Sequence, residues 1–242
     1  MTRWVLVTRS EPELVEYAGA LARHGVQVHP FPVLVERAVD DPQGWAAVGS
    51  QPERFEWLAL TSPRAAQHGV SAAGRHALAE VLARLPVAAV GQRTAELAQR
   101  AGLRVELVGQ RGAAALAATL ASRVSAGGWV LHLCSRQHRP ELAQTLQARG
   151  VHVLPVPVYE MERVDTRELP PLPPGTPVAV LLTSPRAALA YLEVRQGVPL
   201  ACPHLAMGET TAAAAAAQGL AARALAQPTV TAFEEEICRI LS

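Results

Sequence analysis

The strongest constraint on the fold of this chain is an internal repeat. The hexapeptide Thr-Ser-Pro-Arg-Ala-Ala stands at residues 61–66 and again at residues 183–188, 122 residues later. Other segments recur in the same order: Gly25 corresponds to Gly150, and GQRTAELAQRAG corresponds to the later GETTAAAAAAQG. A repeat of about half the chain indicates a duplicated domain rather than a solenoid unit. We therefore expect two lobes of similar fold.

Within each copy, short runs rich in Val and Leu alternate with Ala-rich and Leu-rich segments at helical spacing. In the first copy WVLVTR is followed by EPELVEYAGALARHG and VQVHPFPVLVER; in the second, GWVLHLCSR is followed by RPELAQTLQARG and VHVLPVPVYEMER. Each series is typical of a β-α-β unit. Half of the 242 residues are apolar, which is enough for two cores. The predicted fold class is α/β, with two similar lobes whose parallel sheets are flanked by helices.

The charged residues exclude several classes of function. The formal net charge of +1 provides no strong field for nucleic acid, so no nucleic-acid partner is expected. All 22 basic residues are arginines. A Schiff-base mechanism, a pyridoxal phosphate site and a Walker A phosphate loop are excluded because each needs a lysine. Arginine still offers bidentate recognition of carboxylates.

Cysteine and histidine spacings predict neither a disulfide framework nor a metal site. Cys134, Cys202 and Cys238 form no CxxC motif, and Cys134 lies in the apolar run WVLHLCS, where we expect a buried thiol. The eight histidines show no HxxxH or HxH pairing, so neither a metal nor another cofactor is expected. No apolar run approaches the length of a membrane span, and the first residues lack the pattern of a signal peptide. We therefore expect a cytoplasmic protein without a membrane partner.

Four turns that carry hydroxyl groups follow predicted strands. In each TSPRAA copy the proline fits the first position of a helix, which makes Ser62 and Ser184 the predicted N-caps. Thr231 and Glu234 have the spacing of a capping box and predict the start of the last helix. Capping alone explains any single turn, but helix starts at the carboxyl ends of strands also bind anions. The candidate binding residues in these turns are Thr61, Ser62, Gly91, Thr94, Thr183, Ser184, Gly208 and Thr211.

Two further residues have more than one interpretation. Arg9 ends the first predicted strand, where it is either a solvated surface charge or a contact for an anionic ligand. Tyr159 is either an amphipathic residue at the boundary with water or a proton donor. The chain has no GxGxxG, GxSxG or paired-carboxylate motif. The residues by themselves therefore indicate a two-lobed protein that binds an anionic small molecule.

In order and spacing, the segments resemble the uroporphyrinogen-III synthase family. LVTR near the start, AVGQRTAELAQRAG, GVHVLPVPVYEMERV, LLTSPRAALAYL and AMGETTAAAAAAQGL together extend over nearly the whole chain. The resemblance implies two lobes joined by a two-stranded crossover. The first lobe would be discontinuous, with residues 1–36 and 165–242, and the second would comprise residues 41–158. The proline-edged segments PFPVLVERAV and PVPVYEMERV would supply linkers at 37–40 and 159–164.

The resemblance also implies a reaction. Members of the family cyclise hydroxymethylbilane, a linear tetrapyrrole, with loss of water and inversion of the D ring through a spiro intermediate, and so form uroporphyrinogen III. This lyase step of tetrapyrrole biosynthesis, which leads to heme, siroheme and cobalamin, needs no cofactor. Eight acetate and propionate carboxylates decorate the substrate, and the repeated turns suit such a ligand on a nearly neutral protein. The implied task is to hold a flexible chain in the conformation that leads to inversion.

Residue roles follow from the same resemblance. Tyr159 matches the family tyrosine that is associated with loss of the substrate hydroxyl, and is the candidate catalytic residue. Arg9 matches the arginine of the first strand end, and joins the hydroxyl turns as a substrate-binding residue. Many members have an Arg-Gly pair where this chain has Cys134-Ser135. Arg136 or Arg139 then takes over the contact, and Arg139 is the candidate carried forward.

Alternatives come from other functional classes. A non-catalytic two-lobed protein that binds a polyanionic small molecule would have the same lobes, although such proteins are usually exported. A nucleotide-dependent transferase is disfavoured because the glycine turns are too sparse for a phosphate loop. We expect a monomer that acts on a small-molecule substrate. The resemblance leaves open a hand-over of that substrate from hydroxymethylbilane synthase.

Overall fold

A computed structural model divides the chain into two compact units. Unit 1 comprises Met1–Val35 and Glu162–Ser242, and unit 2 comprises Glu36–Met161. The structure describes residues 3–9, 14–110, 112–195, 198 and 201–242. The sequence predicts linkers at 37–40 and 159–164 between the two lobes, and these bounds stay a prediction.

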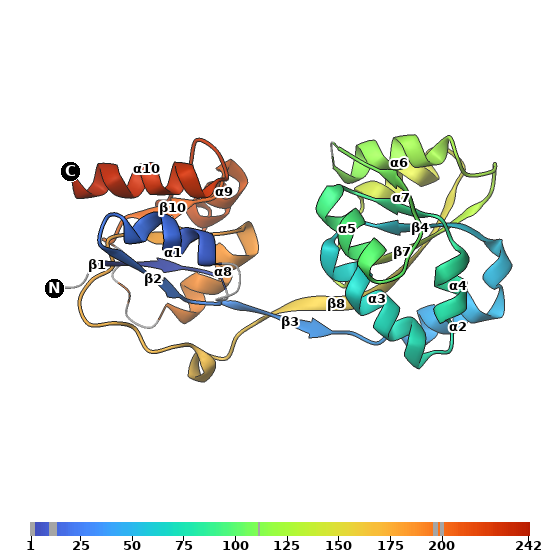
Figure 1. The fold of residues 1–242 in the computed structure, drawn as a ribbon, viewed down its shortest axis with the longest axis horizontal. Coiled ribbons are helices and arrows are strands. Elements are labelled where there is room, and N and C mark those ends of the chain that lie inside the picture. Colours follow the sequence, from blue (N-terminus) through green and yellow to red (C-terminus); the bar gives the residue numbers. More distant parts are fainter. Residues whose placement is uncertain (1–2, 10–13, 111, 196–197, 199–200) are drawn as a thin grey trace. The chain divides into compact units, whose positions relative to one another are not determined.

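Unit 1 contains a parallel sheet with helices on both faces (Figure 1). Its strand order is β11-β10-β9-β1-β2, and every described pair is parallel. The elements are β1 (Arg3–Val7), α1 (Val15–Ala22), β2 (Val26–Pro30), β9 (Val180–Leu182), α8 (Pro185–Val194), β10 (His204–Ala206), α9 (Glu209–Ala216), β11 (Arg223–Ala224) and α10 (Val230–Leu241).

The apolar run of β1 explains these layers. Successive side chains of a strand point to opposite faces of a sheet. Trp4 and Leu6 pack in the core formed with α8 and α9, whereas Val5 and Val7 pack in the core formed with α1 and α10. A strand that is buried on both faces needs apolar residues at every position, which is why WVLV lacks polar alternation.

Unit 2 contains a six-stranded sheet with the order β3-β8-β7-β4-β5-β6. Helices α2 to α5 cover one face, and α6 and α7 cover the other (Figure 1). The elements are β3 (Leu34–Ala38), α2 (Pro42–Ser50), β4 (Phe55–Leu60), α3 (Pro63–Arg75), α4 (Ala79–Arg84), β5 (Val87–Ala89), α5 (Gln92–Arg100), β6 (Val105–Val108), α6 (Ala113–Ala121), β7 (Trp129–Ser135), α7 (Glu141–Gln147) and β8 (His152–Arg163).

The internal repeat corresponds to a repeated sheet. TSPRAA follows β9 in unit 1 and β4 in unit 2. Aligned on these strands, the order β2-β1-β9-β10-β11 of unit 1 becomes β8-β7-β4-β5-β6 of unit 2. The predicted fold class, two similar α/β lobes with parallel sheets, is confirmed.

Strands β3 and β8 form the predicted crossover. The N–H of Val39 donates to the carbonyl oxygen of Val158 over 3.0 Å, and the N–H of Val164 donates to that of Val33 over 3.1 Å. Because one residue number rises as the other falls, the two strands run antiparallel. Strand β3 lies at the edge of its sheet, which is where the prolines that precede it are tolerated.

The helix starts test the predicted caps. The Oγ atoms of Ser62 and Ser184 accept hydrogen bonds from backbone N–H groups three residues later, over 3.2 and 3.1 Å, so both predictions are confirmed. The prediction for the last helix is wrong. Thr229, with extended backbone, caps α10 by accepting from the N–H of Ala232 over 3.2 Å. Thr231 therefore lies inside the helix.

Among the described residues, no helix is long and apolar enough to cross a membrane.

Candidate functional site

The best-placed site in unit 2 lies beyond the carboxyl ends of its two central strands. The chain continues from β4 to β5 on one side and from β7 to β8 on the other, so strand order reverses between β4 and β7. Open parallel sheets bind ligands at such a point. Thr61 and Ser62 follow β4, and Ser135 and Arg139 belong to the end of β7 and the loop after it.

A pocket of about 560 Å³ occupies this place. Its volume is typical of a small-molecule site. Polar groups from three segments surround it, together with the side chains at the start of α6. The lining residues are Thr61, Ser62, Val90, Ala113, Ala114, Ser135, Gln137, His138, Arg139, Glu141 and Tyr159.

Tyr159 and Ser62 meet at the wall of this pocket. The ring of Tyr159, on β8, is buried with 6% of the residue exposed. Its hydroxyl donates to Ser62 Oγ over 2.9 Å, and the same Oγ accepts from the N–H of Ala65. The phenol is thus fixed at the positive end of α3, where developing negative charge is stabilised. The ring is packed in the core and its polar tip lines the pocket, as expected for an amphipathic residue at the boundary with water. The role of proton donor stays a prediction.

The ring of Tyr159 packs against a side chain that belongs to an ion-pair network. The carboxylate of Glu36, on β3, pairs with both Arg64 and His68 of α3. The ring of His68 stacks on that of Tyr159, with centroids 5.7 Å apart and an interplanar angle of 17°. Glu36 therefore holds the first turns of α3 against β3 and fixes the ring beside the phenol.

Thr61 is anchored by a buried histidine. Its Oγ1 atom is hydrogen bonded to His132 Nε2 over 3.0 Å, and His132, on β7, is 1% exposed. Burial, with the nearby His138 ring, lowers the pKa of His132 to about 3. His132 is therefore neutral at ordinary pH. His138 lies edge-on to it, with centroids 5.5 Å apart.

The loop after β7 is tied to β8. The Oε1 atom of Gln137 accepts from the hydroxyl of Ser135 over 3.1 Å and from the N–H of Met161 over 3.3 Å. The Arg136 guanidinium pairs with Glu160 over 3.3 Å. Arg136 is thus directed to β8, whereas the exposed side chain of Arg139 lines the pocket. A guanidinium in this position can form two hydrogen bonds with one carboxylate.

In unit 1 the equivalent turn is bonded differently. The N–H of Thr183 donates to Thr8 Oγ1 over 3.0 Å, and Thr183 Oγ1 donates to the Thr8 carbonyl over 3.1 Å. Thr8, which is 4% exposed, also donates to the carbonyl of Leu181. The point of strand reversal between β1 and β9 is therefore closed by two threonines. Ser184 caps α8 beside it, and Arg9 directly follows Thr8.

The glycine turns present backbone rather than hydroxyl groups. Gly91 and Gly208 are the N-caps of α5 and α9, both with extended backbone. Thr94 and Thr211 occupy the third helical position, and each is 3% exposed. A ligand at either turn would first meet the free N–H groups of the helix start.

The structure thus gathers only part of the predicted set into one pocket: Thr61, Ser62, Arg139 and Tyr159. The other predicted residues lie at turns of the same kind elsewhere in the two units. Sequence reasoning missed several residues that build or adjoin the site: Glu36, His68, His132, Gln137 and His138. It also missed Thr8, which is hydrogen bonded to Thr183 in unit 1. For His132 a signal was available, since His132 and Cys134 are two apart on one strand and therefore share a face of the sheet.

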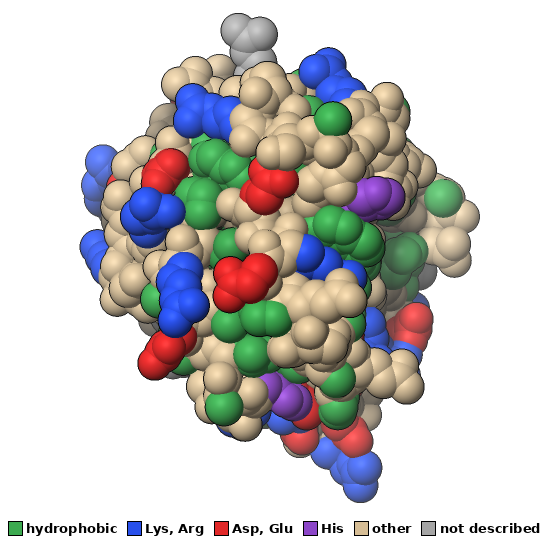
Figure 2. All heavy atoms as spheres, turned by 90° about the vertical axis from the view of Figure 1, so that its right-hand side faces the viewer, with side chains coloured by type: hydrophobic (Ala, Val, Ile, Leu, Met, Phe, Trp, Pro, Cys, Tyr) green, Lys and Arg blue, Asp and Glu red, His purple; other side chains and the backbone are tan. Residues whose placement is uncertain are grey.

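On the visible face of unit 2 (Figure 2), neither positive nor negative side chains dominate. On the face drawn in Figure 2, arginines and carboxylates are interspersed, with apolar side chains scattered among them. This pattern fits the formal net charge of +1. A polyanionic ligand would therefore be held by local donors rather than by a general field.

Comparisons with known proteins show which family this chain resembles. The model of the family described as uroporphyrinogen-III synthase HemD matches residues 15–233. The chain is 28% identical over 250 residues to the chloroplastic uroporphyrinogen-III synthase of Oryza sativa subsp. japonica, covering 98% of this chain and 79% of that protein.

Two solved structures share the fold. Uroporphyrinogen-III synthetase from Helicobacter pylori superposes with a TM-score of 0.71 at 17% identity, covering 99% of this chain and all of that one. A mutant uroporphyrinogen III synthase from the extremely thermophilic bacterium Thermus thermophilus superposes with a TM-score of 0.61 at 18% identity, covering 99% and 98%. Because the family model spans most of the sequence, the chain belongs to the uroporphyrinogen-III synthase family.

Proposed function

We propose that this tetrapyrrole-biosynthesis enzyme closes hydroxymethylbilane to uroporphyrinogen III, with the hydroxymethyl end of the substrate in the unit 2 pocket. The overall reaction removes one water and inverts the D ring. The hydroxymethyl end has to reach a proton donor, because hydroxide is a poor leaving group. Tyr159 is the donor best placed at this pocket.

The proton transfer can be written so that it balances. Tyr159 gives its hydroxyl proton to the substrate hydroxyl, which departs as water and leaves an electron-poor methylene carbon. Attack by the substituted carbon of the D ring forms the first new C–C bond and gives the spiro intermediate. The bond from this carbon to its original methylene bridge then breaks, that methylene bonds to the free carbon of the D ring, and the proton that this carbon releases returns to the phenolate. In the interval Ser62 Oγ, 2.9 Å away, can turn its own proton toward the phenolate oxygen. The N-terminus of α3 stabilises the same negative charge.

Substrate carboxylates provide the second part of the proposal. Arg139 is an exposed cation at the pocket, and the starts of α3 and α5 present N–H groups there or nearby. Helix N-termini bind carboxylates without net positive charge on the protein. Fixing several carboxylates restricts a flexible tetrapyrrole, and this restriction is the source of its preference for one mode of ring closure.

Unit 1 contributes further anion-binding groups in this proposal. Arg9, the start of α8 at Ser184, and the turn at Gly208 are candidates to bind carboxylates. Thr183, which precedes Ser184 in the turn before α8, donates a hydrogen bond to the carbonyl oxygen of Thr8. A monomeric state, a cytoplasmic location and hand-over from hydroxymethylbilane synthase remain parts of the proposal that the family relationship does not fix.

The observation that carries the proposal is the Tyr159–Ser62 hydrogen bond at the wall of a pocket where strand order reverses. The test is to generate hydroxymethylbilane in situ, add the purified protein, oxidise the products and separate the isomers by chromatography. Predominantly isomer III, against isomer I in the blank, would support the proposal. Isomer I alone would favour a non-catalytic binding protein.

A further inference from the structure

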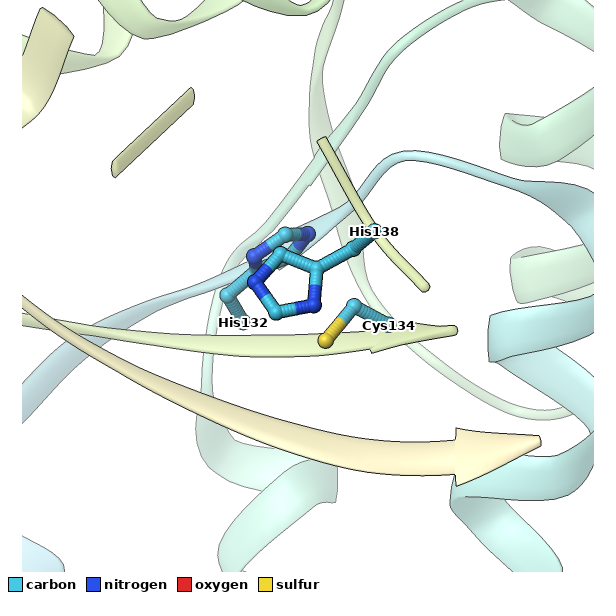
Figure 3. A group of neighbouring side chains, drawn as sticks. All are labelled: His132, Cys134 and His138. Atoms are coloured by element: carbon cyan, nitrogen blue, oxygen red, sulfur yellow. The ribbon is translucent and has the colours of Figure 1, made fainter. Parts of the chain in front are cut away.

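Three side chains with metal-binding atoms meet at the carboxyl end of β7. His132, Cys134 and His138 each offer one ligand atom, and these atoms all lie within 4.8 Å of one another. Figure 3 shows the three side chains grouped beside the strand, and the two imidazole rings lie edge to face. His132 and Cys134 share one face of the sheet, and the loop brings His138 back over them. The cluster is therefore a product of the fold, not of a compact sequence motif.

Hydrogen bonds leave one nitrogen of each imidazole available. His138 Nδ1 donates to the carbonyl oxygen of Ser135 over 3.0 Å, so the lone pair of the neutral ring is on Nε2. In His132, Nε2 is hydrogen bonded to Thr61, and Nδ1 is buried without a hydrogen-bond partner among the described residues. Metal-binding histidines are usually held in this way, through the nitrogen that does not bind the metal.

We propose that His132, Cys134 and His138 form a binding site for a thiolate-preferring transition metal ion, of which Zn²⁺ is the type. Two imidazoles and one sulfur are a ligand set that Zn²⁺ accepts, with a further position left for water or another ligand. Binding forms one metal–sulfur and two metal–nitrogen bonds, and the thiol proton of Cys134 passes to solvent. The orphaned Nδ1 of the 1% exposed His132 gains a partner.

The geometry requires a small movement. Bonds of about 2.0 to 2.3 Å around a tetrahedral ion place ligand atoms roughly 3.3 to 3.7 Å apart, so the cluster has to contract by about 1 Å. His132 and Cys134 are fixed on a buried strand, whereas His138 is half-buried on a loop and lines the pocket. His138 can therefore supply the movement, and the pocket provides a route of entry.

A bound metal ion would also restrict the side chains at one wall of the pocket. His138 lines the pocket, and Thr61 at the same pocket is hydrogen bonded to His132. Metal binding would fix His138 and Thr61 in position. The metal ion would take no part in the proton transfer assigned to Tyr159.

The test uses the full chain after treatment with a chelator. Co²⁺ is titrated in as a spectroscopic substitute, and Zn²⁺ is added afterwards to displace it. We expect one equivalent of Co²⁺ per chain, with a sulfur-to-cobalt charge-transfer band in the near ultraviolet and visible bands typical of low coordination number. Absence of binding, or binding without the sulfur band, would overturn the proposal.

Variants assign the ligands independently of folding. Cys134→Ser should abolish the sulfur band, and His138→Gln, at a half-buried loop position, should weaken binding at least about tenfold. The matched control is Cys202→Ser, since Cys202 is also a buried free cysteine but lies in unit 1. Circular dichroism spectra check that each variant is folded. Equal binding by all three variants would refute the assignment.

Discussion

Replacing Tyr159 by Phe separates the chemical role of its hydroxyl from its structural role. The ring, its packing and its stacking on His68 remain, and only the hydrogen bond to Ser62 is removed. Loss of one such bond costs about 0.5 to 1.5 kcal/mol in the free energy of unfolding. A positioned general acid contributes roughly 10² to 10⁴ in rate. We therefore expect a small loss of stability, a large fall in kcat and little change in KM.

Unit 1 provides the matched control. Tyr191 is fully buried, and its hydroxyl is hydrogen bonded to His204 over 3.0 Å. Tyr191→Phe removes one hydrogen bond of similar length, and Tyr191 does not line the proposed substrate pocket. Its unfolding free energy should fall by a similar amount while its turnover stays that of the parent protein.

The assay records both rate and product. Hydroxymethylbilane is generated in situ, initial rates of isomer III formation give kcat and KM, and urea titration gives the free energy of unfolding. Slow turnover by Tyr159→Phe would let spontaneous closure compete, so the share of isomer I should rise. If the two phenylalanine variants lost stability equally and both kept the parent rate, Tyr159 would have no part in the chemistry.

The remaining predictions concern binding and pH. Ser62→Ala and Ser184→Ala should each lose about 1 kcal/mol of stability as caps and raise KM severalfold, whereas Thr229→Ala should lose only the stability; unchanged KM in both serine variants would refute carboxylate binding at these helix starts. Arg139→Gln should raise KM by roughly three- to tenfold, with a smaller ratio at high salt, and Arg84→Gln, on a helix surface, should not; equal KM values for these two variants would remove Arg139 from the binding site. Burial lowers the pKa of His204, so below about pH 6.5 the unfolded chain takes up a proton that the native state resists, and stability should fall as pH falls. His204→Gln should make that fall less steep when urea titrations are compared from about pH 7 to pH 5, and an equal slope in both proteins would contradict it.

The fold could be predicted because its signals are local and repeated. The run WVLV indicates a strand buried on both faces, and the position of Pro63 and Pro185 identifies the serine caps. The last helix shows the limit of such reasoning. Thr231 has the right spacing for a cap, but Thr229, two residues earlier, already supplies the extended backbone and the acceptor.

The site was harder to predict because its contacts join distant residues. Glu36 reaches Arg64 and His68 only when β3 lies next to β8, and His132 reaches Thr61 only when β7 pairs with β4. Neither distance is contained in a motif. The sequence leaves two interpretations of Tyr159 open and only the family resemblance makes it the candidate catalytic residue, whereas its partner Ser62 is predicted from its turn.

The two copies of TSPRAA have the same sequence but different hydrogen-bond partners. Thr61 is bonded to a histidine beside a pocket, whereas Thr183 is bonded to Thr8 and locks a sheet. After a duplication, one copy of such a turn can come to hold two strands together while the other stays at the wall of a pocket. A complete substitution scan of both hexapeptides should then give different results for the two copies. Substitutions at residues 61 and 62 should mainly reduce turnover, whereas substitutions at residue 183 should mainly reduce folding stability.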